Sequence, residues 1–442
     1  MAQVKRMKGT VDILPAESRI WQYIEDSARA VFETYNFQEI RTPLFEAYEL
    51  FARSSGDTSE IVSKEMYDFK DKGDRHCALR PEGTAGVVRA FVENKLFGPE
   101  HAKPYKVYYM GSMFRYERPQ AGRQRQFNQI GVEVFGSTNP ATDAETIALA
   151  WDFFQELGIE GLTLYINSLG SSQDRARYRQ ALVDYFTPLA DQLSEDSQRR
   201  LTDNPMRILD SKAPEDKALV ANAPKIPDYL SPESKEHFET VKAMLEALEI
   251  PYLVDPSVVR GLDYYQDTIF EIMVDDQAIG AKSTICGGGR YDGLVEALGG
   301  PATPGFGFGI GVERLLLLLK QQEVEVPEAE PLDVYVMGLG QASNIMALRL
   351  VQAARKEGLL AERDYLDRGL KAQFKQADKL KAQVILTIGE DELSAGTVQA
   401  KHPASGKQVT LPLDQVLEDF MGTYRQLTVD TSVIDKYFKG EF

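Results

Sequence analysis

Hydrophobic residues recur at helical spacing near the start of the chain. After a loop at 12–15, six apolar residues fall three or four positions apart and form one face: Ile20, Ile24, Ala28, Val31, Phe32 and Tyr35. Ile40 and Pro43 then suggest an edge strand that bends. Segments 106–110 and 129–135 are strand-like, with a polar segment rich in arginine and glutamine between them. The pattern predicts a helix and then a long antiparallel hairpin, with arginines at its tip and along one strand.

The pattern changes between residues 168 and 249. This stretch is rich in charged residues and helix formers, and prolines at positions 205, 214, 224, 227 and 232 divide it. Strand patterns return at 253–254, 268–274 and 305–311. We therefore expect a sheet that is interrupted by a helical insertion at about 170–250.

A polar segment with two prolines, EVEVPEAEPLD at 323–333, is the best candidate for a linker. Beyond it, DVYVM, a helical stretch around 345–356 and VILTI at 384–388 alternate as strand, helix and strand, which indicates a small α/β domain. The predicted fold class is α/β (α+β). We expect a first domain at 1–325, a linker at 326–333, a small domain at 331–425 and a tail at 426–442.

Composition bounds the class of protein. The chain has 442 residues, 43% of them hydrophobic and 26% charged, which is typical of a globular protein with two or three domains. Its longest apolar run, at 315–319, is far too short to cross a bilayer. The basic N-terminal residues precede no apolar stretch, so we expect no signal peptide and no membrane partner.

Cysteine and histidine are scarce. Cys77 and Cys286 lie far apart, and no two of the four histidines have the spacing of metal ligands. This argues against a disulfide framework and against a metal held by the protein's own side chains. It fits the reducing environment of the cytoplasm.

The net charge of −17 argues against a broad nucleic-acid-binding surface. Binding depends on local patches, however, and the stretch from Lys106 to Arg125 carries five basic residues against the single acid Glu117. The sequence therefore predicts selective contact at a patch, with weak non-specific binding.

The segment from Gly111 to Gly136 carries the first candidate chemistry. Arg115 precedes Glu117 by two residues, so we expect both to project from one face of a strand. An arginine beside a carboxylate there can grip a phosphate while the acid orients it. Phe127, on the returning strand, is suited to stack on a base. The alternative is a surface hairpin with solvated charges.

A second segment, GFGFGIGVERLLLLL, begins at Gly305. Glycine at 305, 307, 309 and 311 removes the side chains from one face of a strand. Such a face suits a flat ligand such as a nucleotide, and Arg314 follows near the start of the next helix. Close packing of another element on the glycines is an equally good explanation. These glycines do not match the dinucleotide-binding fingerprint, so a Rossmann site is unsupported.

Two further segments, VRGLDYYQDTIFEI at 259–272 and GGGRYDGLVEALGG at 287–300, place polar and aromatic residues beside predicted strand structure. Arg260, Tyr264 and Tyr265 come directly before an alternating strand, where a cluster facing a cleft is plausible. Paired tyrosines are also common in cores and interfaces.

Together these segments resemble class II aminoacyl-tRNA synthetases. The segment from Gly111 resembles their motif 2, Gly305–Arg314 resembles motif 3, and TYNFQEIRTPLFE resembles the dimer-forming motif 1. RGLDYY and GGGRYDGL resemble the two signature segments of histidyl-tRNA synthetases, and LRPEGT and KGTVDILP match further blocks of that family. Val11 departs from the polar residue of many members. The resemblance implies an antiparallel-sheet catalytic domain with a helical insertion and a C-terminal anticodon-binding domain.

The resemblance also implies roles in binding ATP. Arg115 would grip the α-phosphate, and Arg260 would approach that phosphate from the other side, which makes these two the expected catalytic residues. Arg314 would stack on the adenine opposite Phe127, and Glu117 would orient ATP.

For histidine, the resemblance implies one group that holds the α-ammonium and one that lines the imidazole pocket. The first group comprises Glu82, Thr84 and Gln129, with Gly83 in the same segment. The second comprises Glu133, Tyr264 and Tyr265. Gln120 and Arg123, in the loop of the hairpin, would contact the acceptor end of tRNA.

The implied function is a histidine–tRNA ligase of the bacterial type, acting in the cytoplasm as a homodimer. Its substrates would be ATP with Mg²⁺, L-histidine and tRNA(His), with no tightly bound cofactor. The main alternative is the synthetase-like regulatory subunit of ATP phosphoribosyltransferase, which senses histidine without catalysis. The presence of Arg260 and of a long segment after the linker disfavours it. A class II synthetase for another amino acid is a second alternative, which the two histidine-type signatures disfavour.

Overall fold

The computed structural model describes residues 3–56, 59, 61–209, 211, 213–259, 264–276, 280–328 and 330–429. The chain divides into two compact units, Met1–Pro327 and Glu328–Phe442. Each unit has its own sheet and its own buried core, so the two are taken in turn.

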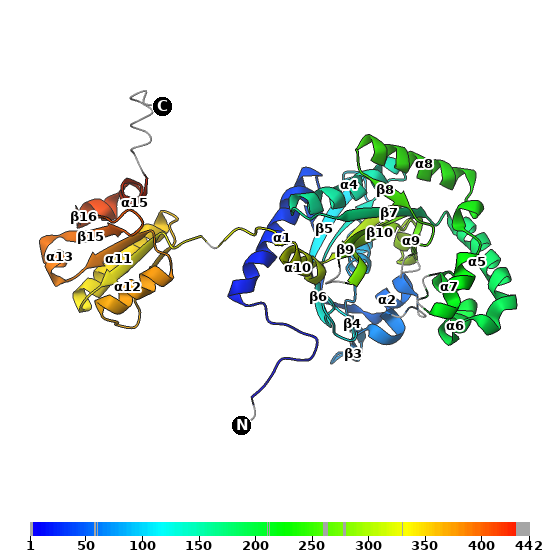
Figure 1. The fold of residues 1–442 in the computed structure, drawn as a ribbon, viewed down its shortest axis with the longest axis horizontal. Helices are drawn as coiled ribbons and strands as arrows, with labels where there is room; N and C mark the ends of the chain where they lie inside the picture. Colours follow the sequence, from blue (N-terminus) through cyan, green and yellow to red (C-terminus); the bar gives the residue numbers. More distant parts are fainter. Residues whose placement is uncertain are drawn as a thin grey trace. The chain divides into compact units, whose positions relative to one another are not determined.

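An eight-stranded sheet forms the centre of the first unit, in the order β1-β5-β6-β11-β10-β9-β7-β8 (Figure 1). Neighbours pair antiparallel except at the two edges, where β1 lies parallel to β5 and β8 parallel to β7. The strands are β1 Gln38–Glu39, β5 Tyr105–Phe114, β6 Gln126–Phe135, β7 Leu162–Ser168, β8 Tyr252–Val254, β9 Gln266–Asp276, β10 Gly280–Arg290 and β11 Gly305–Gly311. The predicted antiparallel-sheet fold class and the hairpin of β5 with β6 are confirmed.

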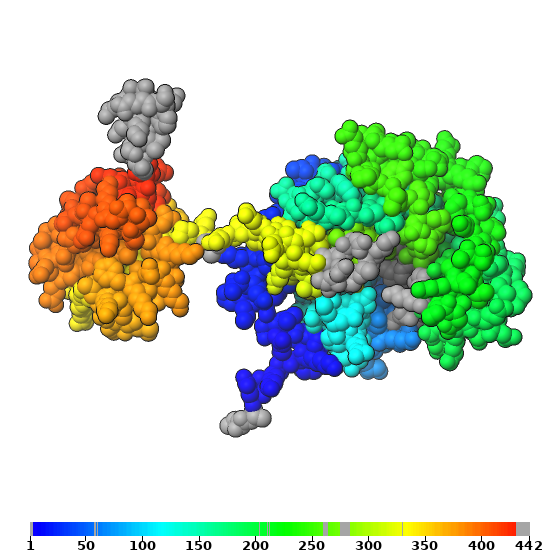
Figure 2. All heavy atoms as spheres, viewed as in Figure 1, coloured from blue at the N-terminus to red at the C-terminus, as the bar shows by residue number. Residues whose placement is uncertain are grey.

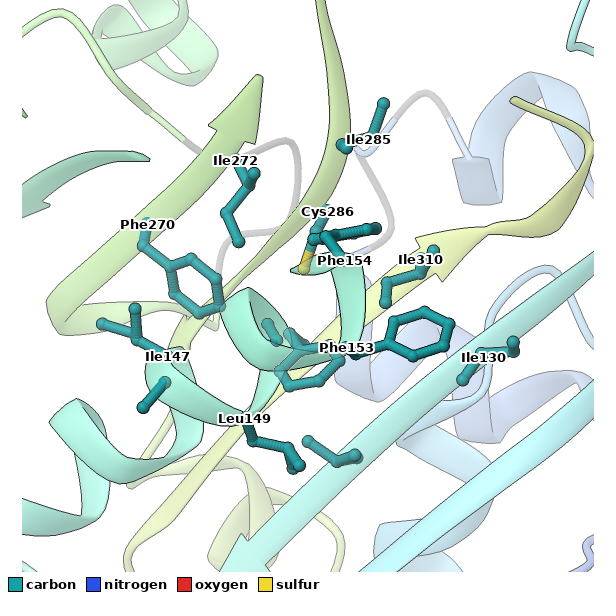
Figure 3. Close-up of a cluster of buried hydrophobic side chains, with 14 of the residues drawn as sticks. Ile130, Ile147, Leu149, Phe153, Phe154, Phe270, Ile272, Ile285, Cys286 and Ile310 are labelled. Carbon is teal, nitrogen blue, oxygen red and sulfur yellow. The ribbon is translucent and has the colours of Figure 1, made fainter. Parts of the chain in front are cut away.

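Helices cover one face of this sheet. They are α1 Pro15–Thr34, α4 Pro140–Glu156, α8 Pro232–Ala247 and α10 Val312–Gln321. Ile130, Ile272 and Ile310, on three different strands, face Phe153 and Phe154 of α4 in the main core (Figure 3). Helix α1 buries Ile24, Ala28 and Phe32, which confirms its predicted apolar face.

The opposite face of the sheet carries a smaller set of elements. They are α2 Tyr48–Ser55, α3 Thr84–Glu93, α9 Leu294–Ala297 and a three-stranded sheet of β2 Phe45–Ala47, β3 Asp68–Lys70 and β4 His76–Leu79. Buried aromatic residues from α3, from β5 and from the position after β10 fill the space between, among them Phe91, Tyr109 and Tyr291. Because strand residues alternate between faces, odd-numbered residues of β6 and β11 point to this side.

The predicted helical insertion lies between β7 and β8. It contains α5 Ser172–Phe186, α6 Glu195–Asp203, α7 Pro214–Ala221 and α8, with 3₁₀ turns Thr187–Gln192, Pro205–Ile208 and Ile226–Tyr229. It has a core of its own around Tyr178, Leu182 and Phe186. In Figure 2 the green part of the chain forms a lobe at one side of the first unit.

Strand β10 was not predicted. Its C-terminal half reads CGGGR, and glycine has low strand propensity, so the sequence gives no alternating signal there. Tertiary pairing overrides that propensity, because β10 hydrogen-bonds to β9 on one side and to β11 on the other.

The second unit is a small α/β domain. Its sheet runs in the order β13-β12-β14-β15-β16, with strands β12 Val334–Gly338, β13 Ala361–Arg363, β14 Val384–Ile388, β15 Thr397–His402 and β16 Lys407–Pro412. The helices are α11 Gln341–Lys356, α12 Leu370–Lys379, α13 Glu390–Ala395, α14 Leu413–Glu418 and α15 Phe420–Thr428. Strands β12 and β14 are parallel, and α11 lies between them in sequence, so the predicted β–α–β arrangement is confirmed. Across the described ranges of both units, no helix combines the length and the hydrophobicity that a membrane span needs.

Candidate active site

The floor of the site is a stretch of sheet that lacks side chains. Gly309 of β11 pairs with Gly131 of β6 on one side and with Gly287 of β10 on the other. An added Cβ at Gly307 would lie 2.0 Å from Oε2 of Glu133, whereas a Cβ at Gly311 would meet nothing within 4 Å. Both explanations of the alternating glycines therefore hold, close packing at 307 and an open surface at 311.

A cavity of about 520 Å³ lies over the open end of this floor. Six of the predicted residues line it together: Arg115, Glu117, Arg123, Phe127, Gln129 and Arg314. They come from the hairpin loop, from β6 and from α10, which the sheet register brings to one place. The cavity suits an anionic ligand with a flat ring, because guanidinium groups and an aromatic ring stand above a bare floor.

The two-residue spacing predicted that Arg115 and Glu117 share a strand, and this prediction is wrong. Strand β5 ends at Phe114, and both residues lie in the loop that follows. Loop contacts set their positions instead: Nε of Arg115 donates to the carbonyl oxygen of Pro81 at 2.8 Å, and a nitrogen of Arg115 lies 3.8 Å from the Glu117 carboxylate. The Arg115 guanidinium also sits over the ring of Phe127, 5.2 Å from its centroid.

Arg314 lies in the first turn of α10, and its Nη1 donates to the carbonyl oxygen of Thr284 at 2.7 Å. Burial lowers the pKa of this guanidinium. Its neighbour Glu313, which the sequence did not single out, accepts hydrogen bonds from the backbone N–H of Asn128 at 2.8 and 3.0 Å. Glu313 therefore ties the start of α10 to β6 and fixes Arg314 above the floor.

A cluster of buried carboxylate and tyrosine side chains adjoins the cavity, because Glu133 lies on the same face of β6 as Gln129 of the cavity wall. Glu82 is 3% exposed, and its carboxylate accepts from the backbone N–H groups of Thr84 and Ala85 at the start of α3, at 2.6 and 3.0 Å. Burial raises the pKa of Glu82, and these two hydrogen bonds oppose that rise. A Cβ on Gly83 would lie 2.1 Å from the ring of Tyr109, so this glycine lets the ring pack against the turn.

Glu133 belongs to this buried cluster and is 1% exposed. Burial raises its pKa to about 8, although a hydrogen bond from the hydroxyl of Tyr291 favours the charged form. The ring of Tyr264 lies 4.7 Å from that of Tyr265 and 5.8 Å from that of Tyr291, between centroids. Tyr291 was missed as a site residue, although it belongs to the GGGRYDGL segment that was singled out.

Three polar atoms in this region are buried and have no hydrogen-bond partner among the described residues: Oε1 of Gln129, Oε1 of Glu133 and the hydroxyl of Tyr264. Buried polar groups are seldom left unpaired, because each costs free energy when it is desolvated alone. Their presence beside a cavity indicates a polar ligand that completes them. Gln129 also lines the cavity of Arg115, so it joins the two halves of the site.

The remaining predicted residues fall into two groups. Gln120 and Arg123 form an isolated bridge at the tip of the hairpin, and Arg123 approaches Glu117 to within 3.6 Å on the cavity wall. Arg260 lies outside the described residues, so its predicted place beside the α-phosphate stays a prediction.

Comparison with known families decides the class of protein. A family model described as histidyl-tRNA synthetase matches residues 9–315, and one described as an anticodon binding domain matches residues 333–421. The chain belongs to the histidyl-tRNA synthetase family.

Relatives of this family match the chain over nearly its whole length. A protein of Limosilactobacillus fermentum named histidine–tRNA ligase is 61% identical over 96% of this chain and 98% of its own length. A protein of Streptococcus equi subsp. zooepidemicus with the same name is 59% identical over 96% of this chain and 99% of its own length. The crystal structure of apo Staphylococcus aureus histidyl-tRNA synthetase matches with a TM-score of 0.81 at 43% identity, over 95% of this chain and all of the other. Full-length ligase relatives leave the regulatory-subunit alternative with less support.

Proposed function

We propose that ATP lies across the glycine floor and that histidine occupies the buried pocket beside it, in an enzyme that joins histidine to tRNA. Membership of the family makes the chain an aminoacyl-tRNA synthetase, a histidine–tRNA ligase. The observation that carries the placement of the substrates is that Gln129 lies on the wall of the arginine-lined cavity and on the same face of β6 as the buried Glu133. The carboxylate of a bound histidine can therefore reach the phosphates of a bound ATP.

In the ATP half, Arg115 binds the α-phosphate and Glu117 holds Arg115 and Arg123 in place. The adenine lies over Gly311, between Phe127 and Arg314. Arg260 approaches the α-phosphate from the other side. Two guanidinium groups at that phosphate would stabilise the negative charge that builds on its oxygens during in-line displacement. Mg²⁺ would be bound by the ATP phosphates, and Glu117 would supply a carboxylate on the cavity wall for it.

In the histidine half, Glu82, Thr84 and Gln129 hold the α-ammonium group, and Gly83 lets the turn that carries Glu82 and Thr84 close against Tyr109. Glu133 accepts an imidazole N–H at its unpaired Oε1, while Tyr291 holds Oε2. Tyr264 and Tyr265 stack along the ring. An amino acid without a matching N–H leaves these buried groups unpaired, which is a strong basis for discrimination.

Two transfers follow from this arrangement. A carboxylate oxygen of histidine attacks the α-phosphorus, the bond to the bridging oxygen breaks, and pyrophosphate leaves with the electron pair. A ribose hydroxyl of the tRNA terminus then attacks the carbonyl carbon of the adenylate, AMP leaves, and the hydroxyl proton passes to the departing phosphate or to solvent. Positioning and electrostatics supply most of the rate in such displacements.

The tRNA contacts lie at two places. Gln120 and Arg123, at the hairpin tip, face the acceptor end. The second unit contacts the anticodon through a groove of about 470 Å³ that includes Arg363, Tyr365 and Arg368. Tyr365 is 61% exposed and its ring lies 5.6 Å from the Arg363 guanidinium, which suits it to stack on a base.

The enzyme works as a homodimer in the cytoplasm. The segment that resembles motif 1 supports dimerisation, because its apolar residues Leu44 and Phe45 are 48% and 58% exposed in the single chain. Adjacent exposed apolar residues of this kind mark interfaces.

Aminoacylation with labelled histidine and tRNA(His) tests the function, with ATP–pyrophosphate exchange run in parallel. We expect histidine to support both reactions, and threonine, proline and glycine to support neither. If histidine binds but supports no exchange, the regulatory-subunit alternative replaces this proposal.

Removal of the second unit after Pro327 tests the place of the anticodon contact. Because Met1–Pro327 is a compact unit with its own core, we expect histidine-dependent exchange to persist and tRNA charging to be largely lost. Full charging by the truncated chain would contradict the assignment.

A further inference from the structure

The helical insertion reaches the active site through a short 3₁₀ turn, Pro205–Ile208. Ile208 is fully buried in the core of the insertion. Met206 packs both against that core and against the cluster that contains Tyr264, Tyr265 and Tyr291. This turn is therefore a point where the insertion packs on the catalytic sheet, next to the histidine pocket.

Arg207, in the middle of this turn, lines the same cavity as Arg115 and Arg314. Among the described residues, the cavity wall draws on the insertion at Arg207 alone. Its neighbour Met206 packs against the aromatic cluster of the histidine half. The same cavity wall includes Gly311 and Arg314, where the adenine is placed.

The cavity wall carries as many carboxylates as guanidinium groups, with Glu65, Glu117, Glu271 and Glu313 against the arginines 115, 123, 207 and 314. These carboxylates already have partners in the protein, and Glu117 lies 3.8 Å from Arg115 and 3.6 Å from Arg123. Glu313 accepts from Asn128, and Glu271 accepts from the hydroxyl of Thr284 at 2.8 Å. ATP has its negative charge on the triphosphate, and a planar guanidinium matches phosphate oxygens in pairs.

We propose that Arg207 is a substrate-binding residue whose guanidinium contacts the phosphates of ATP, so that the helical insertion supplies part of the ATP site. This inference rests on the proposed function. It also gives the insertion a role in the first step of the reaction, because movement of the 205–208 turn changes the ATP site directly.

Steady-state ATP–pyrophosphate exchange with Arg207→Ala and Arg207→Lys tests the inference. Loss of one charge-assisted hydrogen bond to phosphate is expected to raise KM for ATP about 10- to 100-fold, with the KM for histidine changed less than about twofold. Arg207→Lys keeps the charge and should recover part of the affinity. Arg199→Ala is the matched control, because Arg199 lies on helix α6 of the insertion, is 67% exposed and pairs only with Asp196 among the described residues.

The outcomes separate this inference from the function. Absence of histidine-dependent exchange in the unmodified enzyme would refute the proposed function. An unmodified enzyme that is active, with a KM for ATP that Arg207→Ala leaves unchanged, would refute the role of Arg207 alone. A role limited to docking the insertion would shift the melting temperature and both KM values together, and would also overturn the inference. If Arg207→Ala does not fold, Arg207→Gln keeps the stem of the side chain and decides the question by the same KM values.

Discussion

Gly311→Ala separates the stability of the sheet from its use as a ligand floor. Gly311 has φ −86° and ψ 113°, a conformation that alanine adopts without strain. An added Cβ would meet nothing within 4 Å, yet it would project into the cavity that Gly311 lines. The methyl group therefore occupies space that we assign to the adenine, while the protein without ligand has room for it.

The expected sizes follow from these contacts. Replacing glycine at a compatible position stabilises a protein by about 0.4–1 kcal/mol. Overpacking a methyl group against a bound ring costs about 1–3 kcal/mol, which corresponds to a rise of about 5- to 150-fold in KM for ATP. Urea unfolding measures the first quantity and ATP–pyrophosphate exchange at saturating histidine measures the second.

Gly307→Ala is the matched control on the same strand. Its Cβ would lie 2.0 Å from Oε2 of Glu133 and 2.3 Å from the carbonyl oxygen of Val132, so it should destabilise the fold by about 1–3 kcal/mol or more. If Gly311→Ala leaves KM for ATP unchanged, the adenine does not lie on this floor and the placement is wrong.

Two further predictions concern buried charges. Burial raises the pKa of Glu133 to about 8, so the folded protein holds a proton that the unfolded chain releases above its ordinary pKa. Without histidine, the free energy of unfolding of the unmodified protein minus that of Glu133→Gln should therefore fall by about 1.4 kcal/mol per pH unit as pH rises from about 5 to 8. Urea unfolding at several pH values measures this difference. A difference that does not change with pH would contradict the raised pKa. Arg80 is 6% exposed and donates to the carbonyl oxygens of Ser112 at 2.9 Å and Thr42 at 3.0 Å. Arg80→Ala leaves both unpaired and should cost about 3 kcal/mol or more, and a loss below about 1 kcal/mol would show that these bonds do not hold the two segments together.

The regular elements were accessible from the sequence because they depend on local periodicity. Helix α1 and the hairpin of β5 and β6 have patterns of one dominant period, and the structure contains them. Strand β10 has no such pattern. Its glycines are held in the sheet by hydrogen bonds to β9 and β11. These strands are distant partners that a local sequence pattern does not reveal.

Part of the candidate site could be predicted from the sequence, because some of its residues lie in recognisable motifs. Motif resemblance identified Arg115, Glu117 and Arg314, which do line one cavity. The spacing of Arg115 and Glu117 suggested a shared strand, but the chain leaves the sheet at Phe114, so a contact with Pro81 positions the arginine.

The supporting residues needed the three-dimensional arrangement. Tyr291 donates to Glu133, which lies 158 positions away in sequence. Glu313 accepts from Asn128 across 185 positions, and Arg207 reaches the cavity from a separate helical lobe. Tertiary register places these groups together, and no local pattern in a single sequence encodes it.

One kinetic comparison tests the central claim that ATP and histidine occupy the two adjoining halves of this site. KM values for both substrates are measured by ATP–pyrophosphate exchange for Arg314→Ala and for Glu133→Gln. We predict that Arg314→Ala raises KM for ATP about tenfold or more and leaves that for histidine within about twofold, and that Glu133→Gln does the reverse. Equal changes in both KM values for either variant, or effects on the opposite substrates, would contradict the account.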